Sequence, residues 1–195
     1  MAKLYFSYAA MNAGKSTLLL QAAYNYRERG MDVLLLTSAL YKDDDAGHIS
    51  SRIGISADAT LYTQETDLLS LVRDRQADHR VDAVFVDEAQ FLTKDQAWQL
   101  ARVADRLDVP VLAFGLRTDF RGELFEGSAA LLAIADSLRE VRTICECGRK
   151  ATMVVRLGPD GKAVTEGDQV SIGKSTYVSL CRRHWEEKMG RQHPN

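Results

Sequence analysis

The feature that most constrains the fold is a Gly-Lys-Ser sequence between a strand pattern and a helix pattern. Residues 3–8, "KLYFSY", alternate apolar residues and include Tyr and Phe, which predicts a strand. Residues 16–30, "STLLLQAAYNYRERG", have helical composition and end on a glycine suited to a C-terminal cap. A tight loop in this context offers backbone N–H groups, a lysine and a hydroxyl to a phosphate group. We therefore predict a phosphate-binding loop made of Ala9, Ala10, Met11, Asn12, Ala13, Gly14, Lys15 and Ser16.

Within this loop, Lys15 is suited to reach the outer phosphates and Ser16 to hold Mg²⁺. The alternative for Lys15 is an ordinary surface lysine at a helix start. Ala9 stands where such loops usually have glycine. This alanine costs little if its φ is negative, and considerably more if φ must be positive.

Strand and helix patterns alternate along the next hundred residues. Strands are predicted at 32–37, 81–91 and 109–116, and helices at 66–75, 94–107 and 123–135. Residues 38–58 are polar and contain glycine, so we predict a loop there, whose acidic run at 43–45 is more consistent with a solvated face than with a metal site. The alternation predicts an α/β fold with a mostly parallel sheet.

A second carboxylate site is predicted at the end of the 81–91 strand. "AVFVDEAQ" places Asp87 and Glu88 at the carboxyl end of an apolar strand, the edge where open α/β sheets bind ligands. Asp87 fits the Mg²⁺ shell of a phosphate-binding loop, and Glu88 is able to accept a proton from an attacking hydroxyl. The alternative is that both acids cap the following helix.

The composition changes near residue 143, where Gly and β-branched residues become frequent. Cys145 and Cys147 precede Cys181 and His184, and three thiolates with one imidazole suit a closed, structural Zn²⁺ site. The alternative is three free thiols and a surface histidine. We predict a nucleotide-binding domain at 1–143, a small β-rich zinc module at 144–188 and a short tail at 189–195. Residues 185–195, "WEEKMGRQHPN", are predicted to form a short helix that frays.

Bulk properties exclude several classes of protein. The net charge is −2 and the isoelectric point is about 6.1, with no basic stripe, so no direct nucleic-acid binding is expected. No apolar run is long enough to span a bilayer, and the N-terminus is a poor signal peptide, so no membrane association is expected. Three cysteines, two of them close together, do not suggest a secreted disulfide framework, so we expect a cytoplasmic protein.

Five motifs occur in the order found in one enzyme family: "SYAAMNAGKST", "VDEAQFL", "GLRTDFRGELF", "TICECGRKA" and "GDQVSIGKSTYVSLCRRH". Over roughly residues 3–188 the chain resembles thymidine kinases of the cellular, zinc-containing type, most closely the enterobacterial branch. The resemblance implies a RecA-like P-loop domain followed by a zinc-bearing module with a lasso loop. It also implies a homotetramer that transfers the ATP γ-phosphate to the 5′-hydroxyl of thymidine or deoxyuridine.

The resemblance also implies site residues. The loop of residues 9–16 and the stretch Asp87, Glu88, Ala89 and Gln90 would bind ATP and Mg²⁺, with Glu88 as the catalytic base, and Cys145, Cys147, Cys181 and His184 would hold Zn²⁺. The nucleoside would contact Met11, Phe91, Phe120, Phe125 and the lasso residues Val170, Ser171, Ile172, Gly173 and Tyr177. For the aromatic residues the alternative is core packing. Arg52, Arg117 and Arg121 are candidate phosphate contacts, with solvated surface arginine as the alternative.

Two other functions remain open on the residues alone. One is an ATP-driven nucleic-acid motor or ATPase with a zinc module, since "DEAQ" is similar to helicase acidic motifs. The other is a non-catalytic zinc-ribbon binding module on a degenerate nucleotide-binding core. The intact Lys15, Ser16, Asp87 and Glu88 oppose the second, and the short chain without a basic stripe opposes the first.

Overall fold

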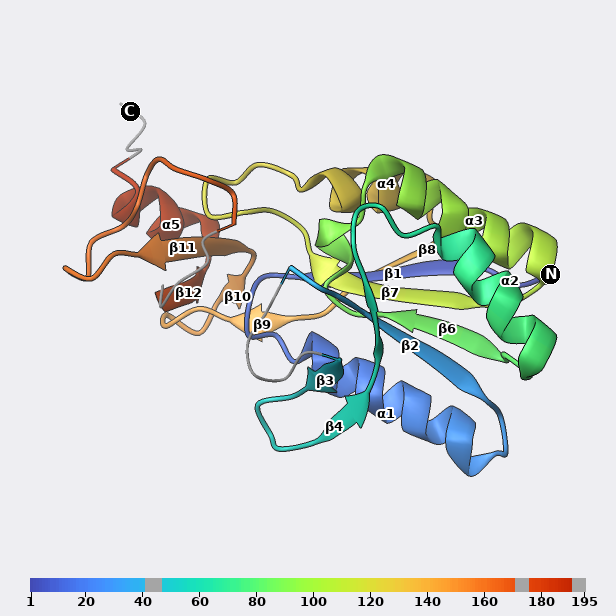
Figure 1. Cartoon of the computed structure of the whole chain (residues 1–195). Helices are drawn as coiled ribbons and strands as arrows, with labels where there is room; N and C mark the ends of the chain where they lie inside the picture. Colours follow the sequence, from blue (N-terminus) through green and yellow to red (C-terminus); the bar gives the residue numbers. More distant parts are fainter. Residues whose placement is uncertain (41–46, 171–175, 191–195) are drawn as a thin grey trace.

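The computed structural model describes residues 1–40, 47–170 and 176–190. Its main body is a six-stranded sheet in the order β5-β2-β6-β7-β1-β8 (Figure 1). All pairs of neighbouring strands in this sheet are parallel, so the predicted α/β fold class is confirmed. The strands are β1 (Leu4–Ala9), β2 (Val33–Ser38), β5 (Thr60–Tyr62), β6 (Ala83–Val86), β7 (Val111–Leu116) and β8 (Ser137–Glu140).

Helices cover both faces of this sheet (Figure 1). One face packs on α1 (Lys15–Glu28); the other packs on α2 (Leu68–Asp78), α3 (Lys94–Leu107) and α4 (Glu126–Ile134). Leu34 and Leu36 of β2 point into the core on the α2–α4 side, whereas Leu35 points into the core on the α1 side. Side chains of a strand alternate between faces, so a strand buried on both needs a continuous apolar run.

Helix α3 has the bounds that the sequence predicts, 94–107, because a capping box fixes its start. The Thr93 hydroxyl accepts a hydrogen bond from the backbone N–H of Gln96, and the Gln96 side chain accepts one from the N–H of Thr93. The other helices differ from their predicted bounds by a few residues, as expected where no such box marks the end.

Two predictions from the sequence are wrong in detail. The predicted loop at 38–58 contains an antiparallel hairpin, β3 (His48–Ser50) and β4 (Ser56–Asp58), in its described part. Ile49 anchors this hairpin in the core beside α1. The acidic run at 43–45 lies outside the described residues. The predicted strand at 81–91 ends at Val86, because Glu88 has a left-handed backbone (φ 52°) that begins the short 3₁₀ helix η1 (Ala89–Phe91).

The chain after residue 143 forms small antiparallel sheets, as predicted, which lie beside the main sheet (Figure 1). One pairs β9 (Thr143–Ile144) with β10 (Lys150–Ala151), and the other pairs β11 (Met153–Leu157) with β12 (Thr176–Leu180). Helix α5 (Arg182–Lys188) follows and starts three residues before the helix predicted at 185–195, whose last five residues lie outside the described residues. The boundaries of the two predicted domains stay predictions. None of the described helices combines the length and the apolar character needed to cross a membrane.

Candidate active site

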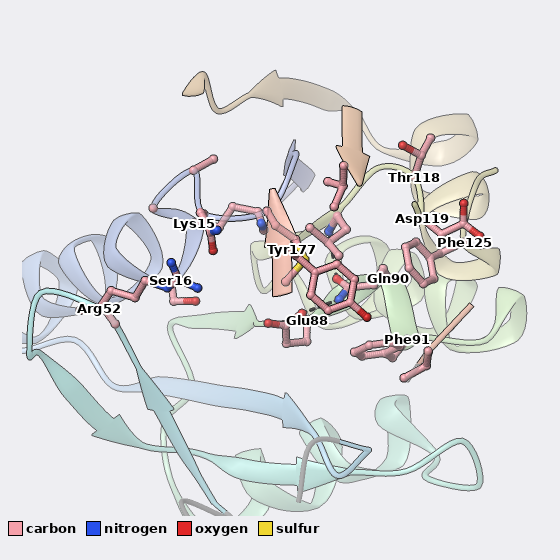
Figure 2. A pocket seen from close by; sticks show the side chains of 18 of the residues that line it. Lys15, Ser16, Arg52, Glu88, Gln90, Phe91, Thr118, Asp119, Phe125 and Tyr177 are labelled. Atoms are coloured by element: carbon pink, nitrogen blue, oxygen red, sulfur yellow. Dashed lines mark hydrogen bonds between the residues drawn. The ribbon is translucent and has the colours of Figure 1, made fainter. Parts of the chain in front are cut away.

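A cavity of about 410 Å³ lies at the carboxyl edge of the main sheet, beyond the ends of β1, β6 and β7. Its walls come from the loop after β1, the β3–β4 hairpin, the turn after β6 and the loop after β7. Val154, Gln169, Val170 and Tyr177 close it from the second part of the chain. Figure 2 shows Lys15, Ser16 and Arg52 on one side of the view and Phe91 and Phe125 on the other.

The predicted phosphate-binding loop joins β1 to α1. Gly14 precedes α1 with φ 80°, a backbone conformation that glycine adopts without strain. Asn12 also has a positive φ, 60°, which asparagine tolerates better than most residues. Ala9 is the last residue of β1, in extended backbone, so a glycine has no advantage there. Residues 11–16 line the cavity, whereas Ala9 and Ala10 are buried behind it.

Lys15 is buried at the start of α1, and its Nζ donates a hydrogen bond to the carbonyl oxygen of Ala10 at 3.2 Å. Burial lowers the pKa of Lys15, while the negative charges of Glu88 and Asp87 act in the opposite direction. The nearby carboxylates therefore favour the ammonium form, which is the form that attracts phosphate oxygens.

Asp87 directly follows β6 and is 4% exposed. Its carboxylate accepts hydrogen bonds from the Ser16 side chain and from the N–H of Glu88. Burial, followed by the charge of Glu88, raises the pKa of Asp87 to about 7. A hydroxyl and a carboxylate in contact are hard oxygen donors of the kind that Mg²⁺ takes in nucleotide sites, so Ser16 and Asp87 fit the predicted metal.

The Glu88 side chain reaches the cavity from the turn between β6 and η1. Its carboxylate accepts a hydrogen bond from Nε2 of Gln90, and its backbone carbonyl accepts one from the Tyr62 hydroxyl at 3.1 Å. The Gln90 amide also accepts a hydrogen bond from the N–H of Leu116 at 2.9 Å. These three contacts fix both the backbone and the carboxylate of Glu88. Because Tyr62 belongs to β5 and Leu116 to β7, the position of Glu88 depends on both strands.

Two glycines let η1 pack closely behind Glu88. A Cβ at Gly115 would lie 2.9 Å from both the backbone N and the side-chain Oε1 of Gln90. A Cβ at Gly127 would lie 2.6 Å from the carbonyl oxygens of Ala89 and Leu92. Any larger residue at either position must displace η1, so these glycines support the predicted stretch 87–90 from behind. Ala89 itself is fully buried and does not line the cavity.

Aromatic and apolar side chains form the end of the cavity opposite Lys15. The rings of Phe91 and Phe125 meet edge to face with centroids 6.0 Å apart. Met11, Phe120 and Tyr177 line the same cavity. The predicted pocket positions are thus brought together, and the phenylalanines are both buried and in contact with the cavity. Of the predicted lasso residues, Val170 lines the cavity, whereas Ser171, Ile172 and Gly173 lie outside the described residues.

The three candidate arginines differ in position. Arg52, next to the tip of the β3–β4 hairpin, lines the cavity. Arg117 donates a hydrogen bond to the carbonyl oxygen of Thr152 at 3.1 Å, and Arg121 pairs with Asp119 at 3.1 Å and with Glu123 at 2.9 Å. Only Arg52 of these three faces the cavity.

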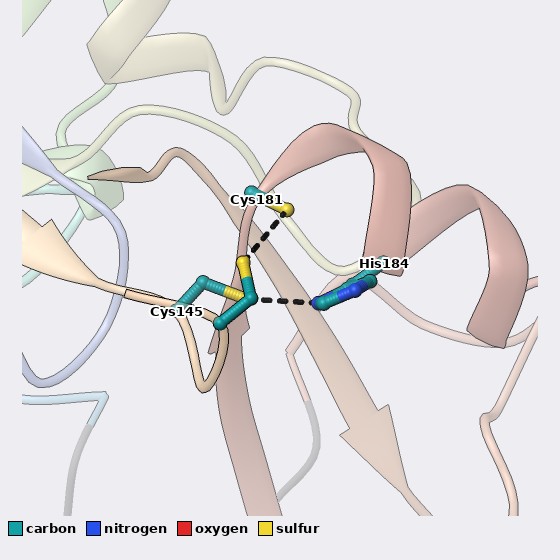
Figure 3. A group of neighbouring side chains, drawn as sticks. Cys145, Cys181 and His184 are labelled. Atoms are coloured by element: carbon teal, nitrogen blue, oxygen red, sulfur yellow. Dashed lines mark hydrogen bonds between the residues drawn. The ribbon is translucent and has the colours of Figure 1, made fainter. Parts of the chain in front are cut away.

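The four predicted metal ligands lie together (Figure 3). Their donor atoms all lie within 4.8 Å of one another, with Cys145 Sγ 3.3 Å from His184 Nδ1 and Cys147 Sγ 3.9 Å from Cys181 Sγ. Burial acts to raise the pKa of the Cys145 thiol, but hydrogen bonds from the Cys147 and Cys181 backbone and from His184 lower it to about 6. Three sulfurs and one imidazole in this arrangement could hold a structural metal ion such as Zn²⁺.

Several lining residues were not identified from the sequence. Ser51, Thr118, Asp119, Val154 and Gln169 all face the cavity. Thr118 and Asp119 precede Phe120 in the motif "GLRTDFRGELF". A threonine and an aspartate in a polar loop do not by themselves indicate a binding site. Asp119 is 3% exposed, and its carboxylate accepts hydrogen bonds from the N–H groups of Arg121 and Glu123 that offset the cost of burial, so its first role is to shape this loop.

Comparison with known proteins identifies the family of this chain. The family model described as "Thymidine kinase" matches residues 2–185. The chain is 64% identical to a thymidine kinase of Mesorhizobium japonicum over 195 residues, which cover 100% of this chain and 96% of that protein. It is 62% identical to thymidine kinases of Ruegeria pomeroyi (97% of this chain, 96% of that protein) and Rhizobium meliloti (97% and 98%). On a match of this extent, the chain belongs to the thymidine kinase family.

Proposed function

We propose that the cavity binds Mg-ATP and thymidine end to end and that Glu88 accepts the proton of the thymidine 5′-hydroxyl. Membership of the family makes the chain a kinase that transfers phosphate to thymidine. One observation carries the assignment of residues. A carboxylate, Glu88, lies in one cavity with Lys15 and Ser16 toward one end and with Phe91 and Phe125 toward the other (Figure 2).

At the phosphate end, backbone N–H groups of the loop 11–16 and the start of α1 cradle the phosphates, and Lys15 lies against the outer ones. Ser16 and Asp87 would hold Mg²⁺, which supplies charge neutralisation on the transferring phosphate when bound. We assign Arg52 as the third cation at this end, because it alone of the three candidate arginines lines the cavity.

At the reacting centre, the hydrogen bond from Gln90 fixes the direction of the Glu88 carboxylate. Glu88 takes the proton as the 5′-oxygen attacks the γ-phosphorus, and ADP leaves. A fixed carboxylate loses little orientational freedom in the transition state, which is the condition for efficient general-base catalysis.

At the apolar end, Phe91 and Phe125 form walls suited to a flat pyrimidine ring. Val170 and Tyr177 would complete this end around the base and the sugar, together with the lasso residues outside the described part of the chain. Deoxyuridine, which lacks only the thymine methyl group, remains the second predicted substrate. One methyl group in an apolar pocket is worth roughly 1–3 kcal/mol, so discrimination between the two is modest.

The homotetramer, implied by the resemblance, and the cytoplasmic location, expected from the cysteine content, stay predictions, and light scattering of the purified protein tests the first. The nucleic-acid motor and the non-catalytic module no longer compete, since the family match extends over residues 2–185 and includes both parts of the chain.

A phosphotransfer assay tests the proposal. Purified protein with Mg²⁺ and ATP should form thymidine monophosphate and ADP in equal amounts when thymidine is added, and a Lys15→Ala variant should lose most of this activity. Cytidine and adenosine serve as control nucleosides, and single-stranded DNA as the control for a motor. ADP formation that ignores thymidine but responds to DNA would refute the proposal.

A further inference from the structure

Arg156 in β11 is a buried cation whose partners, within the described part of the chain, are all uncharged. The residue is 6% exposed. Its guanidinium carbon lies 3.9 Å from the centre of the Phe120 ring, and Nη1 donates a hydrogen bond to the carbonyl oxygen of Asp168 at 2.9 Å. A weaker contact joins Nη2 to the carbonyl oxygen of Glu166 at 3.5 Å. Burying a charge without a charged partner costs free energy. An arginine kept in such a place therefore calls for a functional explanation of its contacts.

The carbonyl contacts hold the chain segment that leads into the cavity. Gly167, between the two acceptors, has φ 120°, and a Cβ there would lie 2.9 Å from Nη2 of Arg156. The next residues, Gln169 and Val170, line the cavity, and the Gln169 amide donates to the carbonyl oxygen of Leu124 at 3.3 Å. Segment 166–170 therefore follows a path set by the guanidinium.

The contact of Arg156 with the Phe120 ring holds the opposite wall of the cavity. Phe120 lines the cavity and is 1% exposed. Its carbonyl oxygen accepts a hydrogen bond from Nε1 of Trp185 at 3.1 Å, and the same Nε1 donates to the carbonyl oxygen of Val154 at 3.0 Å. The backbone of Phe120 is thus tied to β11 and α5, while its ring is held by Arg156.

We propose that Arg156 is a positioning residue for nucleoside binding, which clamps segment 166–170 to the Phe120 wall so that this side of the pocket exists before the nucleoside arrives. A planar guanidinium can stack on a ring with its face and donate to carbonyl oxygens from its edge at the same time. A lysine ammonium cannot, because it lacks the planar fork. Preformed walls reduce the ordering cost of binding. The inference rests on the proposed nucleoside end of the cavity.

The test compares Arg156→Lys, Arg156→Met and Gly167→Ala in the full-length, zinc-loaded enzyme. Gly167→Ala crowds the guanidinium and strains the positive-φ backbone of residue 167 while the charge remains, so it separates loss of these contacts from loss of a buried charge. Arg183→Met is the matched control, because this arginine of the same module forms a surface ion pair with Glu187 and its side chain is 70% exposed. Thermal melts and zinc content show whether each variant is folded.

We expect the thymidine KM to rise about 10- to 100-fold in the two Arg156 variants and in Gly167→Ala, here called the clamp variants. The reason is that hydrogen bonds to a charged group and a cation–π contact are lost or weakened. The ATP KM should change by less than about twofold and kcat by less than about threefold, since uniform binding alone is lost. Amide exchange at residues 166–170 should quicken in the nucleoside-free enzyme. Arg183→Met should match the parent in all these measurements.

Phe125→Ala, which removes a wall of the pocket without touching Arg156, separates the possible failures. If Phe125→Ala raises the thymidine KM and the clamp variants do not, the pocket stands and the inference is overturned. Equal increases in the thymidine KM and the ATP KM, or a lower melting temperature alone, would mean that Arg156 has only a structural role. Either result would also overturn the inference. An unchanged thymidine KM in Phe125→Ala would refute the proposed pocket and with it this inference.

Discussion

Replacing Glu88 by glutamine tests the proposed base without disturbing its surroundings. The substitution keeps the size of the side chain, and the new amide oxygen is still able to accept the hydrogen bond that Nε2 of Gln90 donates to the carboxylate. The Tyr62 hydroxyl continues to hold the backbone carbonyl of residue 88. The ability to accept a proton is lost, together with one negative charge near Lys15 and Asp87. The contacts that position η1 therefore predict a folded enzyme with a nearly unchanged cavity.

The expected loss follows from the share that a positioned base supplies. Removal of general-base catalysis costs roughly 10²- to 10⁴-fold in kcat, whereas the affinities for ATP and thymidine should stay within about threefold of the parent. Single-turnover measurements of thymidine monophosphate formation report the chemical step, and calorimetric titration reports the affinities. Tyr62→Phe is the control. It removes one hydrogen bond to the backbone of Glu88, so it should cost about 0.5–1.5 kcal/mol of stability with a much smaller loss of turnover.

Two results would refute the reasoning. Near-parental turnover of Glu88→Gln would mean that another group, or water, accepts the proton. A large loss of thymidine affinity with an unchanged single-turnover rate at saturation would make Glu88 a binding residue instead.

Three further predictions concern the surroundings of the site. Gly115→Ala places a Cβ 2.9 Å from the backbone N of Gln90, so η1 must shift; kcat should fall at least about tenfold, and a parental kcat would contradict this packing argument. Burial raises the pKa of Asp87 from its ordinary 3.8 to about 7; an acid with a raised folded-state pKa favours folding when protonated, so the metal-free protein should lose stability as pH rises from about 4 to 7. Thermal melts of Asp87→Asn should show a smaller loss over that range, and identical pH profiles would contradict the assignment. Chelation of zinc should speed amide exchange in the described parts of 144–184 and raise the thymidine KM before it weakens ATP binding, because Trp185 ties this region to Phe120; equal loss of both affinities would mean that the metal supports the whole fold.

The sequence predicts the parts of the site that lie at the ends of regular elements. The Gly-Lys-Ser sequence and the Asp87–Glu88 pair each follow an apolar strand, and parallel strands bring their carboxyl ends to one edge, so their meeting could be expected. The Cys/His cluster that could hold a structural metal could be predicted from residue type and spacing alone, since four such side chains have few other reasons to occur in this order.

Other features depend on contacts that no local pattern encodes. The hairpin at 48–58 is predicted as a loop because Ile49 is its only strongly buried residue. The strands β5 and β8 are not predicted because both are short and lie at the edges of the main sheet. The left-handed backbone of Glu88 could not be expected from a glutamate, because the conformation is imposed by the packing of η1 against Gly115 and Gly127. Long-range packing, rather than local propensity, sets these positions.

The order of strands has a consequence for how the chain reaches this fold during synthesis. β1 is the first strand to leave the ribosome, yet its two neighbours are β7 and β8, the last two strands of the main sheet to be made. The N–H of Leu4 finds its partner, the Asp136 carboxylate, 132 residues later. Until β7 and β8 have been synthesised, neither edge of β1 has a strand to pair with. Unpaired edges of an apolar strand can form β-sheet hydrogen bonds with other nascent chains. Ribosome-bound chains that stop before residue 111 should therefore need a holdase, and release of that requirement should coincide with the emergence of residues 111–140.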